Sequence, residues 1–374
     1  MSSNANSIGG AKPAVKPSLG WGRARPLKAL VLFASILGLL LPGCSDPNGW
    51  KKVDVSKEKV NFTVQRFDRD FFAIDTLHLD ESEAKLRAKY GPFYDFYVHR
   101  IMNFSKPDNP MDTHRIDPHI RLLGFLGNRS DQDLYDSVQK EYANTADVES
   151  GLTDMLKHFQ YYFPNKPHIT RVYTFITEFS NAVATYDDST LCIGLDMYLG
   201  STFRYYQSVD LPQFMVAKLK RPYIVPNATE VLYSLHFDKT AYDAQLPLIE
   251  ALIDEGKKYY FMECMMPDAP DSLIMGYTRD QEAWCRSSEA SVWKYLNEQD
   301  LLYKVNFMVQ KRFTTDGPTT TGLPPESPAK VGSWMGWQIV RKFMKNNGGK
   351  VTLPELLDKY TAKQIFAMSN YKPK

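Results

Sequence analysis

The chain concentrates its β-type sequence in residues 168–195, between two long stretches with helical periodicity. Residues 168–179 are rich in Val, Ile, Thr and Phe, residues 182–186 alternate between apolar and polar side chains, and residues 191–195 follow a polar turn. Such a short β region cannot form the core of the domain alone. The pattern predicts a mainly α-helical α+β fold, with a small antiparallel or mixed sheet packed by helices.

Helical periodicity before and after this region sets the other expected elements. An alternating segment at 60–67 predicts one more strand. A loop rich in Thr, Gly and Pro is expected at 314–328. Helices are expected near residues 80–90, 92–103, 117–127, 131–143, 147–163, 212–220, 227–236, 241–265, 278–298, 333–346 and 353–368.

The N-terminus has the charge and length pattern of a signal peptide. Residues 1–43 contain five basic residues and no acidic residue, and they end in the apolar run 29–41. Thirteen apolar residues span about 20 Å of helix, which is shorter than the roughly 30 Å hydrocarbon core of a bilayer. We therefore expect a cleaved leader and no permanent membrane span.

The leader ends in Leu41-Pro42-Gly43-Cys44, which resembles the bacterial lipobox, with Pro42 in place of the usual small or hydroxyl residue. This resemblance implies cleavage before Cys44 and acylation of its thiol, including palmitate. Two or three acyl chains would anchor the mature chain to a bilayer. Ser45 and Asp46 give no known inner-membrane retention signal, so the outer membrane is expected. The alternative is an ordinary signal peptide cleaved nearby, with Cys44 incidental.

Cleavage would leave 331 residues and change the formal net charge from +2 to −3, so nothing favours nucleic-acid binding. The remaining cysteines, Cys192, Cys264 and Cys285, allow at most one disulfide, so the fold must depend on its core. We expect a lipidated tether at 44–60 and a globular domain at 61–374. Within that domain, 61–165 would form a helical N-terminal part and 166–374 a second part.

Four residues form the candidate binding or buried polar site. Glu255 lies on the apolar stripe of its predicted helix together with Tyr259, and a buried carboxylate requires a cation, a metal or converging donors. Trp334 and Trp337 would either pack in the core or, with nearby tyrosine pairs, form a platform for a sugar ring. Core packing is the favoured interpretation.

The usual catalytic motifs are missing from the sequence. It contains no HExxH, G-x-S-x-G, P-loop or G-x-G-x-x-G pattern. His114 and His119 lie near Asp112 and Asp117, so a loop metal site is a minor alternative to ordinary loop polarity. We therefore expect no catalytic residue, no metal and no cofactor.

Seven stretches in order resemble the GldB-type gliding motility lipoproteins. The resemblance implies an outer-membrane lipoprotein facing the periplasm, required for surface gliding and linked to the machinery that supports type IX secretion. Its expected partners are the bilayer and other envelope or gliding proteins. The stretches are RFDRDFF at 66–72, KYGPFY at 89–94, HFQYYFP at 158–164, IGLDMYLG at 193–200, IDEGKKYY at 253–260, the Tyr- and Trp-bearing segment 277–293, and SNYKP at 369–373.

A more distant resemblance is to zinc peptidases of the gluzincin kind. Glu255-Gly256 with Tyr259 or Tyr260 approximates the E-G-x-x-x-Y pattern of the helix that supplies the third zinc ligand, and residues 332–340 resemble the glycine-bearing helix that follows. The histidine helix would fall at 221–235, where both imidazoles and the general-base glutamate are absent. The resemblance thus implies a degenerate zincin-like architecture in residues 166–374.

The favoured hypothesis is a non-catalytic component of the gliding and secretion envelope machinery. The first alternative is a carbohydrate- or peptidoglycan-binding lipoprotein that uses its aromatic groups. The second is a zinc metallopeptidase with unusual ligands, Glu255 among them.

Overall fold

A four-stranded mixed sheet connects the two halves of the sequence. In the computed structural model, which describes residues 52–105, 117–237 and 245–373, the strand order is β1-β2-β4-β3. β1 (Thr63–Gln65) and β4 (Thr190–Gly194) both run parallel to β2 (Arg171–Phe175), and β3 (Val183–Asp187) is antiparallel to β4. The expected small mixed sheet is confirmed, and its first strand comes from more than 100 residues upstream of the second.

The hairpin between β3 and β4 sits at the sheet edge. The Asp187 carboxylate accepts hydrogen bonds from the backbone N–H and the hydroxyl of Ser189, which fixes the turn. β4 is buried along its whole length and β3 only half-buried, because β4 lies between two strands and β3 has one neighbour.

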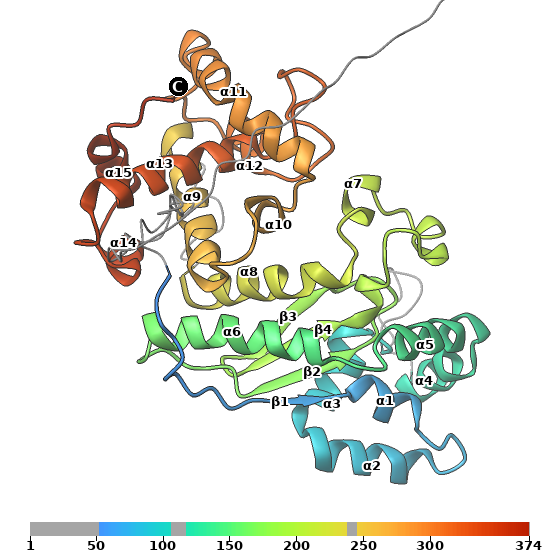
Figure 1. Ribbon diagram of the computed structural model, residues 1–374. Coiled ribbons are helices and arrows are strands. Elements are labelled where there is room, and N and C mark those ends of the chain that lie inside the picture. The colour runs from blue at the N-terminus through green and yellow to red at the C-terminus, as the bar shows by residue number, and fades with distance from the viewer. Residues whose placement is uncertain (1–51, 106–116, 238–244, 374) are drawn as a thin grey trace, which may run out of the picture. The chain divides into compact units, whose positions relative to one another are not determined.

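Helices of the N-terminal part pack beside the sheet (Figure 1). A π-helical turn, Tyr97–Ile101, continues α3, and Phe67 of α1 packs edge-on against the rings of Tyr90 and Phe93. The helices are α1 (Phe67–Phe72), α2 (Leu79–Tyr90), α3 (Pro92–Phe96), α4 (Pro118–Gly127), α5 (Arg129–Glu141) and α6 (Ala146–Tyr162).

Asp68, in the RFDRDFF stretch at 66–72, is fully buried and forms hydrogen bonds with three other side chains. Arg66 donates to both of its carboxylate oxygens at 2.9 and 2.7 Å. Gln139 of α5 donates at 2.8 Å, and Thr174 of β2 donates through its hydroxyl. One carboxylate thus ties α1, α5 and β2 together, and its charge is compensated by Arg66.

The second half of the chain is almost entirely helical. Short 3₁₀ turns at Leu195–Tyr198, Arg204–Gln207 and Arg221–Tyr223 lead into α8 (Ile224–Phe237), which packs against β3 and α9. The other helices are α7 (Gln213–Val216), α9 (Leu248–Met265), α10 (Asp271–Met275), α11 (Arg279–Glu298), α12 (Phe307–Thr314), α13 (Val331–Asn347), α14 (Leu353–Asp358) and α15 (Ala362–Ser369).

Several expected elements need correction. The strand expected at 60–67 ends at Gln65, since Phe67 and Phe71, four residues apart, both face the core from α1. The single helix expected at 353–368 is two helices, because Thr361 forms a new capping box with Gln364. α10 and α12 were not expected. Residues 241–244 of the helix expected at 241–265 lie outside the described residues.

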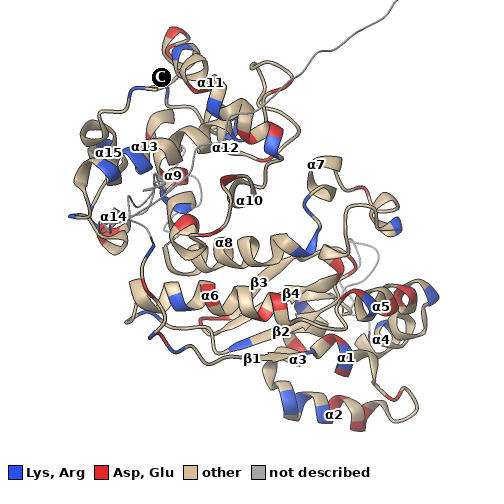
Figure 2. Cartoon of the chain, viewed as in Figure 1, with Lys and Arg blue, Asp and Glu red and all other residues tan. Residues whose placement is uncertain are grey.

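The described residues belong to one compact unit, Asn48–Lys374. Within them, no helix is both long and apolar enough to cross a membrane. Basic and acidic residues are interspersed along the helices (Figure 2). The leader expected at 1–43 and the expected lipidation site Cys44 lie outside the described residues.

Candidate functional site

The four candidate residues meet where α9 crosses α13. The Tyr259 ring lies 5.9 Å from that of Trp337, and the rings of Trp334 and Trp337 are 5.8 Å apart and nearly perpendicular. The Ser333 hydroxyl lies 3.5 Å from a carboxylate oxygen of Glu255. The structure therefore places all four at one helix–helix contact.

Two glycines allow this contact to be unusually close. A Cβ atom on Gly336 would lie 1.6 Å from the carbonyl oxygen of Leu252, and one on Gly256 would lie 2.3 Å from the backbone of Gly336. Backbone atoms cannot move aside as side chains can, so any larger residue would force α9 and α13 apart. This requirement accounts for the glycine-bearing pattern of both helices.

The two tryptophans do not form a sugar platform. Trp334 is 1% exposed and Trp337 is fully buried, so neither ring offers a face to a ligand. Arg341 covers Trp337, with its guanidinium carbon 3.8 Å from the ring centre, and the Trp337 N–H donates to Glu263. The interpretation of Trp334 and Trp337 as carbohydrate-binding residues is therefore wrong, and core packing is the observed role.

Glu255 is paired with a cation from its own helix. The Lys258 ammonium lies 3.1 Å from Glu255 and 2.9 Å from Glu230 of α8, so it bridges two carboxylates on neighbouring helices. The Glu230 side chain is 45% exposed and that of Lys258 is 17% exposed. The site is thus an ion-pair cluster in partial contact with solvent.

The charges in this cluster stabilise one another's ionised forms. The positive charge of Lys258 lowers the pKa of Glu230 to about 2, and Lys330 and Lys218 act in the same direction. Burial alone would raise this pKa. Burial alone would lower the pKa of Lys258, but the charges of Glu230 and Glu255 outweigh it and raise that pKa well above its usual value. Near neutral pH Lys258 is a cation without a lone pair, which makes it neither a base nor a nucleophile.

The arrangement does not suit a catalytic zinc ion. α8 lies beside α9, as the gluzincin resemblance requires, but it carries no histidine before His236 in its last turn. Asn227 donates to the Tyr198 hydroxyl at 2.7 Å, and Pro226 stands beside it. The space between Glu230 and Glu255 is bridged by an ammonium group, and the donor set lacks the imidazoles that zinc prefers.

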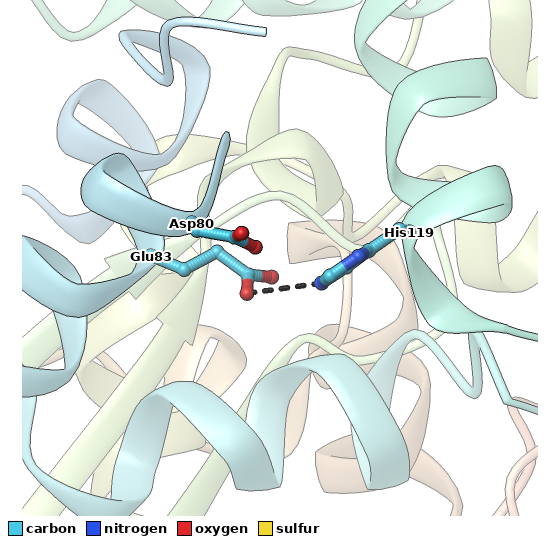
Figure 3. Close-up of side chains that lie close together, drawn as sticks. All are labelled: Asp80, Glu83 and His119. Carbon is cyan, nitrogen blue, oxygen red and sulfur yellow. Dashed lines mark hydrogen bonds and ion pairs between the residues drawn. The ribbon is translucent and has the colours of Figure 1, made fainter. Parts of the chain in front are cut away.

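A second acidic cluster joins Asp80, Glu83 and His119, whose potential ligand atoms lie within 4.8 Å of one another (Figure 3). Glu83 already accepts hydrogen bonds from Tyr94 at 2.7 Å, Arg87 at 3.1 Å and His119 at 3.1 Å. Burial raises the pKa of Glu83, but these hydrogen bonds outweigh it and hold the pKa below its usual value. A metal would have to displace the Arg87 guanidinium, so the donor set fits one poorly.

The loop metal site considered for His114 and His119 finds no support in the described part of the chain. Asp117 caps α4 by accepting from the backbone N–H of His119, and the His119 ring lies 3.1 Å from Glu83 and 3.9 Å from Asp117. His114 and Asp112 lie outside the described residues.

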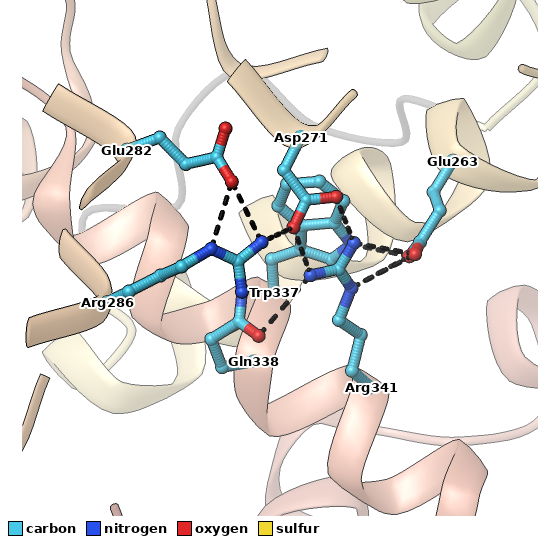
Figure 4. Close-up of polar contacts among 7 residues, drawn as sticks. All are labelled: Glu263, Asp271, Glu282, Arg286, Trp337, Gln338 and Arg341. Carbon is cyan, nitrogen blue, oxygen red and sulfur yellow. Dashed lines mark hydrogen bonds and ion pairs between the residues drawn. The ribbon is translucent and has the colours of Figure 1, made fainter. Parts of the chain in front are cut away.

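An arginine network fastens α13 to its neighbours (Figure 4). Arg341 donates to Glu263 at 2.6 Å and to Asp271 at 2.6 Å, and Arg286 joins Asp271 to Glu282. Each guanidinium group donates to two carboxylates, and such charge-assisted hydrogen bonds are strong. They connect α9, α10, α11 and α13 to one another.

Sequence reasoning missed Glu230, Lys258 and the Glu263–Arg341 pair. Helical periodicity assumes one solvated side and so gives no reason to pair Lys258 with Glu255, whereas α9 is buried on almost all sides. The resemblance that sets α8 beside α9 was the available signal for pairing Glu230 with Lys258.

The three described cysteines, Cys192, Cys264 and Cys285, are buried thiols, and no disulfide joins them. Burial raises the pKa of Cys285 to about 12, which keeps that thiol protonated and unreactive. The described part of the chain therefore depends on its core and on ion pairs.

The comparison with protein families identifies the chain's family. The family model described as gliding motility protein GldB matches residues 48–373, nearly the whole chain. No curated protein and no solved structure matches, so the degenerate zincin-like architecture stays a prediction.

Proposed function

The chain belongs to the gliding motility protein GldB family, and on that premise we propose that it is a lipid-anchored, non-catalytic component of the gliding and associated secretion machinery of the cell envelope. The family match supports the lipoprotein and motility parts of this proposal. The globular domain would act by binding partner proteins.

The proposed anchor is lipid on Cys44, at the periplasmic face of the outer membrane. The lipobox-like sequence Leu41-Pro42-Gly43-Cys44 supports it, as does the start of the family match at residue 48, directly after the proposed cleavage site. Several acyl chains would make the attachment stable, since each buried CH₂ contributes about 0.8 kcal/mol.

The observation that carries the non-catalytic proposal is Lys258. Its ammonium bridges Glu230 and Glu255, and the gluzincin resemblance would give Glu255 to the metal as its third ligand. A tethered cation neutralises the carboxylates as a metal would, but it has no open coordination position and cannot lower the pKa of a water molecule. The cluster therefore serves the packing of α8 on α9.

The test is zinc content and peptide turnover of the purified mature protein. We expect no stoichiometric zinc and no peptidase activity, and the Glu255→Gln variant should change neither. Stoichiometric zinc that disappears in Glu255→Gln, together with turnover, would establish the metallopeptidase alternative. Crosslinking in the native envelope would then identify the partners that a binding role requires.

A further inference from the structure

A pocket of about 640 Å³ lies beside the N-terminal segment 52–56, away from the α9–α13 contact. Its size is within the range of small-molecule and cofactor sites. The lining comes from the N-terminal segment 52–56, α6, the start of α8, and the stretch that runs from the end of α9 into α10.

The inner wall of the pocket is apolar and adaptable. Met155 and Met265 are each 1% exposed, and Met266 and Val225 are half-buried beside them. Unbranched thioether side chains adjust to the shape of a flexible apolar ligand better than branched ones do. Such a wall suits a hydrocarbon chain.

The N-terminal segment runs along this pocket. All five residues 52–56 line it: Val53 and Val55 are half-buried, and Lys52, Asp54 and Ser56 are exposed. Lys52 also bridges to Asp268 at 2.7 Å. Cys44 precedes Lys52 by eight residues, which span at most about 29 Å when fully extended. If Cys44 carries the anchor, the pocket therefore stays within that distance of the bilayer.

The charged groups at the pocket have both signs. Lys52 and Lys157 supply cations, and Asp54, Asp154 and Asp268 supply carboxylates. Lys52 and Asp268 are 53% and 84% exposed, which places this pair at the water side. A purely anionic headgroup would face an excess of carboxylates, whereas a headgroup with one phosphate and one ammonium can be complemented at both ends.

From these observations we propose that the pocket binds one acyl chain of an aminophospholipid from the leaflet that anchors the protein. The proposal rests on the lipid anchor of the proposed function. Moving an acyl chain from a bilayer into an apolar pocket exchanges one hydrocarbon environment for another, so little hydrophobic free energy is lost. The short tether keeps the local lipid concentration high, which favours weak binding.

The test uses the mature lipidated protein in phosphatidylethanolamine vesicles that contain a trace of diazirine-acyl phosphatidylethanolamine. After illumination, adducts are mapped by peptide mass spectrometry. We expect them on the α6 peptide carrying Met155 and on the 265–273 segment.

Leu273→Glu, which places a charge in the pocket, should reduce these adducts on the order of tenfold, as burying an unpaired charge is unfavourable. The matched control, Leu123→Glu at an exposed position outside the pocket, should leave them unchanged.

Adducts spread evenly over the surface, or equal labelling in wild type and Leu273→Glu, would overturn the proposal. Equal pocket labelling by a diazirine phosphatidylglycerol would overturn its headgroup part. The wild-type map does not depend on how any variant folds. The mass of the N-terminal peptide separately reports the lipid on Cys44: pocket labelling without that lipid would contradict the anchor but support the pocket.

Discussion

Lys258 neutralises two carboxylates from two helices, so its removal leaves Glu230 and Glu255 repelling each other across the α8–α9 contact. We predict that Lys258→Gln lowers the free energy of unfolding at pH 7 by about 1–3 kcal/mol, less than for a fully buried pair because Glu230 is partly exposed. Urea denaturation measures the change.

The matched control is Lys294→Gln, which removes an exposed lysine 3.6 Å from Glu298 on α11. Exposed pairs contribute little, so its effect should stay within about 0.5 kcal/mol. Equal effects of the two substitutions would show that the bridging position of Lys258 has no special importance.

Asp131 should make stability depend on pH. Burial, with the nearby charge of Glu178, raises the pKa of Asp131 to about 7, against about 3.9 in an unfolded chain. Between these values the folded state binds more protons, so this residue's contribution makes stability fall as pH rises from about 4 to 7. Asp131→Asn should remove that slope and stabilise the protein by about 1–3 kcal/mol at pH 8.

The readout is the urea midpoint of wild type and variant at pH 4 and pH 8. The exposed Asp136→Asn on the same helix is the control and should shift neither midpoint appreciably. A variant no more stable than wild type at pH 8 would show that ionised Asp131 costs the native state nothing and that its pKa is not raised.

At the residue scale, the sequence shows that a charge on an apolar stripe, such as Glu255, requires compensation, but it does not show which residue supplies it. The position of Glu255 on an apolar stripe requires a cation, a metal or converging donors, but its pairing with Lys258 does not follow from helical periodicity, which assumes one solvated side. α9 is covered by α8, α13 and α15, so that assumption fails. The burial of Trp334 and Trp337 fits the preference for core packing.

At the scale of elements, the α9–α13 crossing depends on Gly336. We predict that Gly336→Ala destabilises the protein by several kcal/mol, on the order of 3, because the new methyl group meets the Leu252 carbonyl rather than a movable side chain. Gly124→Ala, inside α4 with nothing within 4 Å of the added Cβ, should stabilise by about 0.5–1 kcal/mol through helix propensity.

Thermal denaturation of both variants provides the measurement. Opposite signs are expected from the same chemical change in two helices. A mild effect of Gly336→Ala, similar in size to that of Gly124→Ala, would contradict the close backbone contact.

Helices with strong periodicity and caps were predictable, whereas elements defined by distant contacts were not. α11 begins at Arg279, one residue after the start of the helix expected at 278–298, and Thr278 caps it in a capping box with Gln281. The sequence does not predict α1, because six residues contain less than two turns of helical periodicity, and the strand expected at 60–67 extends into its first residue. The parallel pairing of β1 with β2 joins segments over 100 residues apart, and no local pattern records it.

At the scale of the whole molecule, composition and an ordered set of motifs were more informative than any single residue. The family resemblance, spread over seven stretches, is confirmed by a match to residues 48–373. The pocket at the N-terminal segment was not predictable, because its walls come from four separate stretches of the chain.

The central claim is that lipid on Cys44 holds a binding protein at the envelope. The most direct measurement is membrane fractionation of cells that carry Cys44→Ala in place of the native gene, with surface gliding or secretion scored in the same strain. We predict that the variant loses lipid, leaves the outer-membrane fraction or remains unprocessed, and fails to support the machinery. A soluble, unlipidated variant that supports it fully would contradict the account.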